Sequence, residues 1–345
     1  MARLRVFLLT YRRPHLLRRA LRSLLAQTYR DWVCELHNDA PDDDTPRTVL
    51  AEMAPGDSRF VYAPHARNLG AVGTFNLVFE GGPEPFASLL EDDNTWEPHF
   101  LETLVAVLER HPAAAMAWAN MHQRIEQPDG SWLEIEQTLW PVNANTPPLI
   151  VFDRPEWLQA FDAIHSTGAM VFRPNRFRTS AVPAHAPLAI IEPLRERAAA
   201  GPLLFVTKPL AHFARTQQTA RDGDPLRWLQ AKLLIAASFF ADRPIAEEQL
   251  RQLWASRRAL RPRDTGMLFL LAIALGRAEL VRPARLGDWT HFLLNGLRHP
   301  INLIRSLQFR RAFPETWAWL EVQTAATTGS LEARLLEKSL QPRPI

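Results

Sequence analysis

The first 110 residues alternate between short apolar runs and amphipathic segments, and this alternation restricts the possible folds more than any other feature of the chain. The apolar runs have the length of buried strands and cover residues 4–10, 32–39, 59–65 and 86–93. Helical patterns lie between or after them, from Pro14 and at residues 47–54, 70–81 and 97–110. Strands that alternate with helices predict an α/β fold, in which a mostly parallel sheet has helices on both of its faces.

Each of the four runs ends in polar residues. These ends are Thr10 and Tyr11, Asn38 and Asp39, residues 65–68, and residues 91–93. In a parallel α/β sheet the ligand site lies beyond the carboxyl ends of the strands. We therefore expect the four polar ends to lie at one edge of the sheet and to form the functional site there.

Three consecutive acids, Glu91, Asp92 and Asp93, follow the fourth run in the stretch LLEDDNTWEP. Like charges this close repel one another, and a carboxylate beside a core loses hydration, so a positive partner is expected among them. Carboxylate oxygens at a strand end are ligands that Mg²⁺ and Mn²⁺ prefer. The alternative is structural: Asp92, Asp93 and Asn94 would cap the helix that follows, and the stretch taken alone favours neither interpretation.

Two other segments add to the predicted site. The stretch HNDAPDDDT places Asp39 at a strand end facing the expected cleft, whereas residues 42–44 are typical of a turn and a helix cap. The stretch ARNLGAVGTFN enters a helix with Arg67 and Asn68 beside its N-terminus, which suits the binding of an anion. Neither a GxGxxG fingerprint nor a P-loop motif is present, so the sequence does not indicate a dinucleotide site or a P-loop.

These motifs occur in a fixed order along the chain: TYRRP at residues 10–14, an amphipathic helix, HNDAPDDDT, RNLG and LLEDDNTWEPHFLE. The ordered set resembles the inverting family 2 glycosyltransferases. The resemblance is strong over residues 4–110 and continues weakly to about residue 216. It implies the GT-A fold, a Rossmann-like nucleotide-binding α/β domain, and a nucleotide-diphosphate sugar as the donor substrate.

The resemblance also implies roles for individual residues. The Tyr11 ring would stack on the nucleotide base, and Asp39 would form a hydrogen bond with that base, which is usually uracil. Asp93, with Glu91, would hold Mn²⁺ or Mg²⁺ against the diphosphate of the donor. The residues implied in donor binding are Thr10, Tyr11, Arg13, Asp39, Arg67, Asn68, Glu91 and Asp92.

Three features depart from the family pattern. Glu91 replaces the first aspartate of the usual DxD motif, and Ala40 replaces a common glycine. The catalytic base of the family usually lies well after the metal motif, often as Glu-Asp, and here the stretch PLAIIEPLRER offers Glu192. The alternative interpretation of Glu192, an acid at a helix N-terminus, has nearly the same weight as the catalytic role. His165 and His212 flank this stretch, and each is more typical of a structural histidine than of a ligand.

The resemblance predicts metal-dependent transfer of one sugar, from a UDP-sugar or similar donor to an acceptor hydroxyl, with inversion. A glycan or a lipid-linked glycan is the expected acceptor, and surface polysaccharide or glycan biosynthesis is the expected pathway. Two alternatives remain open. A sugar-phosphate nucleotidyltransferase would use a similar sheet, but it usually has a glycine-rich, lysine-containing loop where this chain has TYRRPHLL. A catalytically degenerate glycosyltransferase-like binding protein would keep the donor site without turnover.

From about residue 220 the pattern becomes helical, so we expect a catalytic domain over residues 1–219 and a helical domain over residues 220–345. Basic charge is concentrated there, since residues 251–311 hold twelve arginines and three acids while the whole chain has a net charge of +3. Residues 290–311 place apolar side chains at helical spacing among arginines, and Pro300 should kink or split this helix. The segment either packs on the catalytic domain or makes a peripheral contact with an anionic membrane, and general experience of amphipathic helices favours the first.

The sequence also bears on location. Cys34 is the only cysteine, so the chain cannot form an internal disulfide, which favours a reducing compartment. The apolar run MLFLLAIALG is about half of the ~20 residues that a membrane-spanning helix needs. We expect a cytoplasmic protein, either soluble or peripheral at the inner face of the membrane, with no nucleic-acid partner.

Overall fold

The computed structural model describes residues 3–152, 166–177, 181–218, 224–241, 245–260 and 265–323. The chain divides into two compact units. The sheet unit comprises Met1–Ala181 and Ala198–Arg221, and the helical unit comprises Val182–Arg197 and Asp222–Ile345. The expected domain boundary at residue 219 stays a prediction, and the grouping differs from it for residues 182–197. These residues pack with the helices because the short 3-10 turn Leu188–Ile190 contacts the long helix α7 (Pro225–Phe240).

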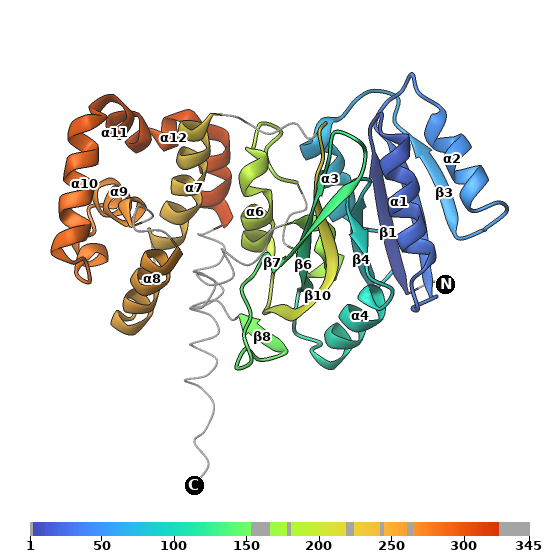
Figure 1. Ribbon diagram of the computed structural model, residues 1–345, viewed down its shortest axis with the longest axis horizontal. Coiled ribbons are helices and arrows are strands. Elements are labelled where there is room, and N and C mark those ends of the chain that lie inside the picture. Colours follow the sequence, from blue (N-terminus) through green and yellow to red (C-terminus); the bar gives the residue numbers. More distant parts are fainter. Residues whose placement is uncertain are drawn as a thin grey trace, which may run out of the picture. The chain divides into compact units, whose positions relative to one another are not determined.

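The sheet unit is built on a mixed sheet in which most strands run the same way, as the sequence predicts (Figure 1). The strands follow the order β3-β2-β1-β4-β9-β6-β10-β5, with β7 beside β6 and β8 beside β10. The strands with a parallel neighbour are β1 (Leu4–Thr10), β2 (Trp32–Asn38), β3 (Phe60–Pro64), β4 (Phe86–Glu91), β6 (Met116–Glu126) and β10 (Leu203–Arg215). The strands with antiparallel pairing alone are β5 (Thr95–Trp96), β7 (Trp132–Thr138), β8 (Leu149–Phe152) and β9 (Met170–Phe172).

Helices cover both faces of this sheet, which confirms the predicted layers. Three helices share one core with the sheet, and they are α1 (Pro14–Leu25), α2 (Thr45–Met53) and α4 (Phe100–Arg110). Val171 of β9 belongs to that core, whereas the next residue, Phe172, stacks on Phe79 at 4.6 Å. Because successive side chains of a strand point to opposite faces, the helix that carries Phe79, α3 (Gly70–Glu80), packs on the other face.

One predicted boundary differs from the structure at the start of α4. The sequence places the helix start near Glu97, but the helix begins at Phe100. The chain before it is still part of the sheet, since β5 pairs with β10 and the Glu97 backbone N–H donates to the Leu210 carbonyl at 2.8 Å. Pro98 follows directly, and a residue before proline avoids the helical conformation.

The helical unit is all-α in its described part. Its helices are α6 (Ile191–Ala198), α7, α8 (Glu247–Leu260), α9 (Gly266–Leu275), α10 (Leu286–Arg298), α11 (Pro300–Leu307) and α12 (Phe309–Ala312). Aromatic side chains form much of the core, in which the Phe269 ring of α9 contacts the rings of Trp254, Trp289 and Phe292. Trp254 is completely buried, and its indole N–H donates to the Leu280 carbonyl at 2.8 Å.

The helix predicted around residues 290–311 is split, as Pro300 requires. α10 ends at Arg298, and α11 begins at Pro300, which occupies the first helical position where its missing N–H costs nothing. Across the described residues, we find no helix with the length and apolar character needed to cross a membrane.

Candidate functional site

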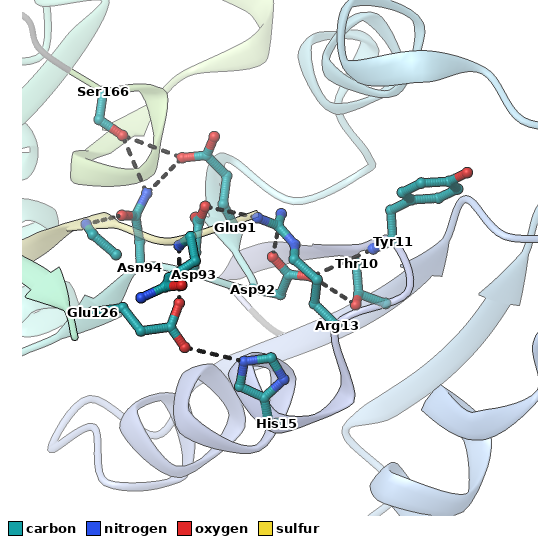
Figure 2. Close-up of polar contacts among 12 residues, drawn as sticks. Thr10, Tyr11, Arg13, His15, Glu91, Asp92, Asp93, Asn94, Glu126 and Ser166 are labelled. Carbon is teal, nitrogen blue, oxygen red and sulfur yellow. Dashed lines mark hydrogen bonds and ion pairs between the residues drawn. The ribbon is translucent and has the colours of Figure 1, made fainter. Parts of the chain in front are cut away.

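The site begins at the end of β1, where the backbone turns sharply. Arg12 has a φ of 54°, and it is the one residue other than glycine with a positive φ among the described residues. A large side chain in this region is strained, and such strain is often kept at functional sites. The turn leaves the Tyr11 ring 45% exposed, and Figure 2 shows it pointing away from the acidic cluster.

Asp92 is the buried member of the acidic cluster. Its side chain is completely inaccessible to solvent. Its Oδ2 accepts hydrogen bonds from Thr10 Oγ1 at 2.8 Å and from the Tyr11 backbone N–H at 3.3 Å. Burial raises the pKa of the Asp92 carboxyl to about 7, against the opposing pull of the Arg13 guanidinium. These contacts fix the end of β4 against the end of β1, so Asp92 positions its neighbours, and donor binding by Asp92 itself stays a prediction.

The positive partner of the acids is Arg13. Its Nη2 lies 2.6 Å from Asp92 Oδ1, and its Nη1 donates to Asp93 Oδ2 at 3.0 Å. Figure 2 shows the guanidinium between the two carboxylates. Arg13 precedes α1 directly, so the helix start holds its backbone in place. The alternative that the acids cap the next helix is wrong, because the residue at the N-cap of α4 is His99.

Glu91 points to a different set of partners. Its Oε2 accepts hydrogen bonds from Asn94 Nδ2 at 2.6 Å and from Ser166 Oγ at 3.2 Å. Asn94 is itself tied to β10, because its Oδ1 accepts the Ala214 backbone N–H at 3.1 Å. Gly168 lies close by, and a Cβ there would meet Glu91 Oε2 and Asn94 Nδ2 at 2.9 Å each. Asp92 and Asp93 therefore share Arg13, whereas Glu91 accepts hydrogen bonds from Asn94 and Ser166.

Asp39 lies at the end of β2 and holds the entry to α3. Its Oδ1 accepts the Leu69 backbone N–H at 2.7 Å, and its Oδ2 accepts the Gly70 backbone N–H at 2.9 Å. The Nδ1 of His65 lies 2.9 Å from Oδ1. Asn68 is exposed and donates through Nδ2 to the Asp39 carbonyl at 3.1 Å. Asp39 therefore has a structural role in addition to the predicted contact with a base. Its hydrogen bonds order the segment that carries Arg67, and the Arg67 side chain is exposed.

A line of polar side chains continues from Asp39 across the sheet. His65 Nε2 lies 3.0 Å from His37 Nδ1, and His37 Nε2 lies 3.1 Å from Glu35 Oε2. Arg5 pairs with Glu35 and also with Glu84, to which its Nε donates at 2.7 Å. This line joins the ends of β2 and β3 to β1 and to the segment before β4. Through His65, this line of side chains holds the Asp39 carboxylate in place.

Glu192 belongs to the helical unit, in the first turn of α6. That position agrees with the helix N-terminus interpretation, and a role as catalytic base stays a prediction. His212 is buried, with its Nε2 2.6 Å from Glu97 Oε1, and burial lowers its pKa. His165 lies outside the described residues.

The acidic cluster offers few ligands to a divalent cation. Among the described residues, no three histidine, cysteine, aspartate or glutamate side chains are arranged to hold a metal ion. Asp92 is fully enclosed and Glu91 is turned toward Ser166, which leaves the Asp93 carboxylate beside Arg13. Mg²⁺ is commonly bound by one or two carboxylates together with substrate phosphates. The described residues therefore offer a cation no ready-made cage of side chains, and a metal contact at Asp93 or Glu91 stays a prediction.

The mostly parallel sheet with helices on both faces places this unit among α/β domains of the GT-A type. Residues 6–167 match the family model described as Glycosyl transferase family 2. The chain therefore carries a family 2 glycosyltransferase domain, as the order of its motifs predicts.

Known proteins similar to this chain agree with that assignment. An uncharacterized glycosyltransferase of Nostoc sp. is 29% identical over 106 residues, and the match spans 30% of this chain and 32% of that protein. TarS 1–349 of S. aureus in complex with UDP is 12% identical and has a TM-score of 0.53. The match covers 90% of this chain and 91% of the TarS chain. Its complex with UDP-GlcNAc has a TM-score of 0.55 at 11% identity. At this identity the likeness shows the fold.

Sequence reasoning missed several residues of this edge. Ser166 contacts Glu91 from 75 positions along the chain, and no local pattern signals such a contact. Glu126 ends β6 beside the cluster, with its Oε1 3.5 Å from His15 Nε2 (Figure 2). Glu126 carried no clear signal, because the second half of β6 reads HQRIE and only its first half is an apolar run.

Proposed function

We propose that the protein transfers one sugar from a nucleotide-diphosphate sugar to an acceptor hydroxyl with inversion at the anomeric carbon. The observation that carries this proposal is the arrangement at the strand ends: an exposed Tyr11 ring, the Asp39 carboxylate and the Asp93 carboxylate, in a family 2 glycosyltransferase domain. UDP is the proposed nucleotide, supported by the similar fold of TarS, which binds UDP and UDP-GlcNAc.

The donor would lie along the strand ends in a defined order. The Tyr11 ring offers a flat apolar face to the base, and Asp39 and the backbone that it orders offer polar contacts to it. Thr10 and Asp92 hold the Tyr11 backbone in place. The exposed Arg67 and Asn68 flank the diphosphate, and Arg13 is the cation nearest to Asp93. Mn²⁺ or Mg²⁺ bound by Asp93 would neutralise charge on the departing diphosphate.

The acceptor hydroxyl needs a base to take its proton during the displacement. A carboxylate within hydrogen-bond reach is suited to this step near neutral pH. We assign the role to Glu192, the acid in the first turn of α6. A single displacement with a base on the acceptor side accounts for inversion, and the product then leaves with the opposite anomeric configuration.

The proposed acceptor is a glycan or a lipid-linked glycan, and the proposed setting is surface polysaccharide or glycan biosynthesis in the cytoplasm. The alternative of a degenerate binding protein differs in one measurable respect, because it would bind the donor without turnover.

The test is a panel of UDP-, GDP- and dTDP-sugars incubated with the protein and a set of simple glycosides, with Mn²⁺ and with a chelator. We expect turnover of a UDP-sugar that the chelator abolishes, and a product whose anomeric configuration is inverted by NMR. The Asp93→Ala variant should bind UDP without Mn²⁺ enhancement. Asp42→Ala is the matched control, because Asp42 is an exposed acid that pairs with Arg12 in the same region. Donor binding without turnover for every acceptor would overturn the proposed reaction.

A further inference from the structure

The outer side of α10 and α11 is apolar. Its large exposed side chains are Leu286, Leu293, Leu294, Leu297, Ile301 and Ile304, which we call the α10–α11 surface. Leu297 is 78% exposed and Ile301 is 64% exposed. Residues three or four positions apart share one side of a helix, so the members on α10 form a stripe that continues into α11. Single exposed apolar side chains are ordinary, but a continuous set of this size marks an interaction site.

Each of these two helices has one buried side chain, and that side chain is polar. The buried residue of α10 is Asp288, whose Oδ2 accepts from Arg258 Nη2 at 2.7 Å and from the Arg285 backbone N–H at 2.8 Å. The buried residue of α11 is Ser306, whose hydroxyl donates to the Asn302 carbonyl at 2.7 Å. An amphipathic helix turns its apolar stripe toward the medium or partner that covers it. Here that stripe is turned away from the core of the unit.

The inner sides of both helices are already packed. α10 contacts α9 through the rings of Trp289 and Phe292, which lie 4.7 and 4.6 Å from the ring of Phe269. α11 contacts α7, and Gln230 Nε2 donates to the Arg305 carbonyl at 2.6 Å. The helical unit therefore holds α10 and α11 in place without using the leucines and isoleucines of the α10–α11 surface.

Charge around this surface is of one sign. Residues 289–314 contain no aspartate or glutamate. The exposed arginines in this stretch are Arg298, Arg305, Arg310 and Arg311. An apolar stripe edged by arginines is complementary to a bilayer with anionic headgroups, in which side chains such as leucine enter the acyl boundary and guanidinium groups meet phosphates. A second copy of the chain is a poorer occupant, because it would bring the same arginines against these.

We propose that the α10–α11 surface binds the anionic face of a lipid bilayer and holds the protein at the membrane as a peripheral protein. The binding does not depend on the transfer reaction, since it uses none of the residues at the strand ends. It explains why the helices of residues 290–311, for which packing was the favoured expectation, keep their apolar side chains exposed.

Vesicle flotation measures this directly. The full chain is mixed with vesicles of phosphatidylcholine alone or with phosphatidylglycerol added, at low and at high salt. We expect flotation with the anionic vesicles at low salt and a marked loss at high salt, because exposed charges are screened. Each arginine replaced by glutamine should weaken binding at low salt by about fivefold. Failure to float with anionic vesicles at low salt would overturn the proposal.

Two sets of variants separate the apolar from the electrostatic contribution. Leu293→Asn with Leu297→Asn and Ile301→Asn should abolish flotation, and Arg298→Gln with Arg305→Gln and Arg311→Gln should abolish it at moderate salt. The matched control is Val61→Asn with Leu133→Asn, which changes two exposed apolar residues of the sheet unit and should leave flotation unchanged. All six surface positions are exposed, so these variants should keep the unfolding temperature of the parent chain.

A site-specific probe tests the direction of insertion. Cys34 is the only cysteine and is completely buried, and burial raises the pKa of its thiol, so it should not react with a maleimide. A polarity-sensitive dye attached at Leu297→Cys should shift to the blue when anionic vesicles are added, while the same dye at Val61→Cys should not. Self-association that is lost in the Leu297→Asn variant, with no vesicle binding at low salt, would instead assign the surface to a second copy and overturn the proposal.

Discussion

The two units reverse the usual distribution of side chains in opposite ways. At the strand ends of the sheet unit, charged groups such as Asp92 and Asp39 are buried, and each is held by several hydrogen bonds. On the helical unit, leucines and isoleucines such as Leu297 and Ile304 are exposed, while Asp288 of α10 is buried. Each reversal has a cost in water, either the dehydration of a charge or the hydration of an apolar surface.

The difference between the two regions indicates two kinds of ligand. Buried acids with fixed partners keep their geometry before a ligand arrives, which suits a small polar ligand that must be oriented. An exposed apolar stripe has no fixed partner and fits a fluid or variable surface. We therefore expect substitutions at the strand ends to change binding and catalysis, and substitutions on the α10–α11 surface to leave both stability and catalysis unchanged.

The largest effect is expected at Asp93. Asp93→Ala should abolish transfer with Mn²⁺ present, because the carboxylate that would hold the cation is gone, whereas the fold should survive since Arg13 keeps its contact with Asp92. Steady-state turnover and thermal unfolding measure the two outcomes. Turnover near that of the parent chain would remove Asp93 from the metal site.

Glu192 is an exception to the difference between the two units, because it is a proposed catalytic group that lies in the helical unit. Glu192→Gln should lower kcat by about 10²–10⁴-fold and leave donor affinity unchanged, since the loss of a general base acts on the transition state. Glu248→Gln, in an exposed ion pair of α8, is the control. Equal losses in kcat and in affinity, or no loss, would assign the base to another group.

Arg13 tests how strongly the buried acids depend on their cation. Arg13→Gln should lower the free energy of unfolding by about 1–3 kcal/mol near neutral pH, because it leaves the completely buried Asp92 Oδ1 without its partner. Arg18→Gln in α1 removes an exposed pair with Glu52 and should cost no more than about 1 kcal/mol. Chemical denaturation of the three proteins at one pH measures both values, and equal costs for the two variants would contradict the difference in burial.

Asp39 sharpens the comparison because it has both a structural and a proposed binding role. Asp39→Ala should weaken UDP binding by about 1–3 kcal/mol by calorimetry. The loss of its contacts with the backbone at the start of α3 should also lower stability by about 1 kcal/mol, as for other helix caps. An unchanged UDP affinity with a lowered stability would leave Asp39 with the structural role alone.

The smallest effect is expected on the α10–α11 surface. Leu293→Asn or Ile304→Asn should change the free energy of unfolding by no more than about 0.5 kcal/mol, because both side chains are exposed. Leu271→Ala in the core of α9 should cost about 2–5 kcal/mol in the same assay. A cost at Leu293 close to that at Leu271 would show that the leucine is packed in solution and would remove the contrast between the two regions.

The sheet unit follows from its sequence where the pattern is long and regular. Residues 4–10 and 32–38 are strands because apolar runs of this length, bounded by polar residues and followed by helical segments, fit a parallel sheet. Strands β5 and β9 have two and three residues, too few for any period to be visible. Their presence depends on pairing with distant strands, which one local stretch does not encode.

The candidate site was also predictable only in part, because some of its features are local in the sequence and others depend on distant contacts. The acids at 91–93 and their need for a positive partner were visible, but the identity of that partner was not, because the contact joins Arg13 to a residue 80 positions away. On α10, the sequence shows which residues share a side of the helix but not which side faces the core. The burial of Asp288 depends on Arg258, which lies on another helix 30 positions earlier.

The contact between Asn94 and Ala214 has a consequence for the order of folding. It spans 120 positions, and it anchors the loop that follows Glu91, the last residue of β4. Contacts between positions far apart in the chain form late, because the loop between them must close first. During synthesis, the first 110 residues could pair β1 to β4 while the loop after β4 still lacked its anchor. The strand ends would become competent to bind a donor only once β10 has been made and has entered the sheet.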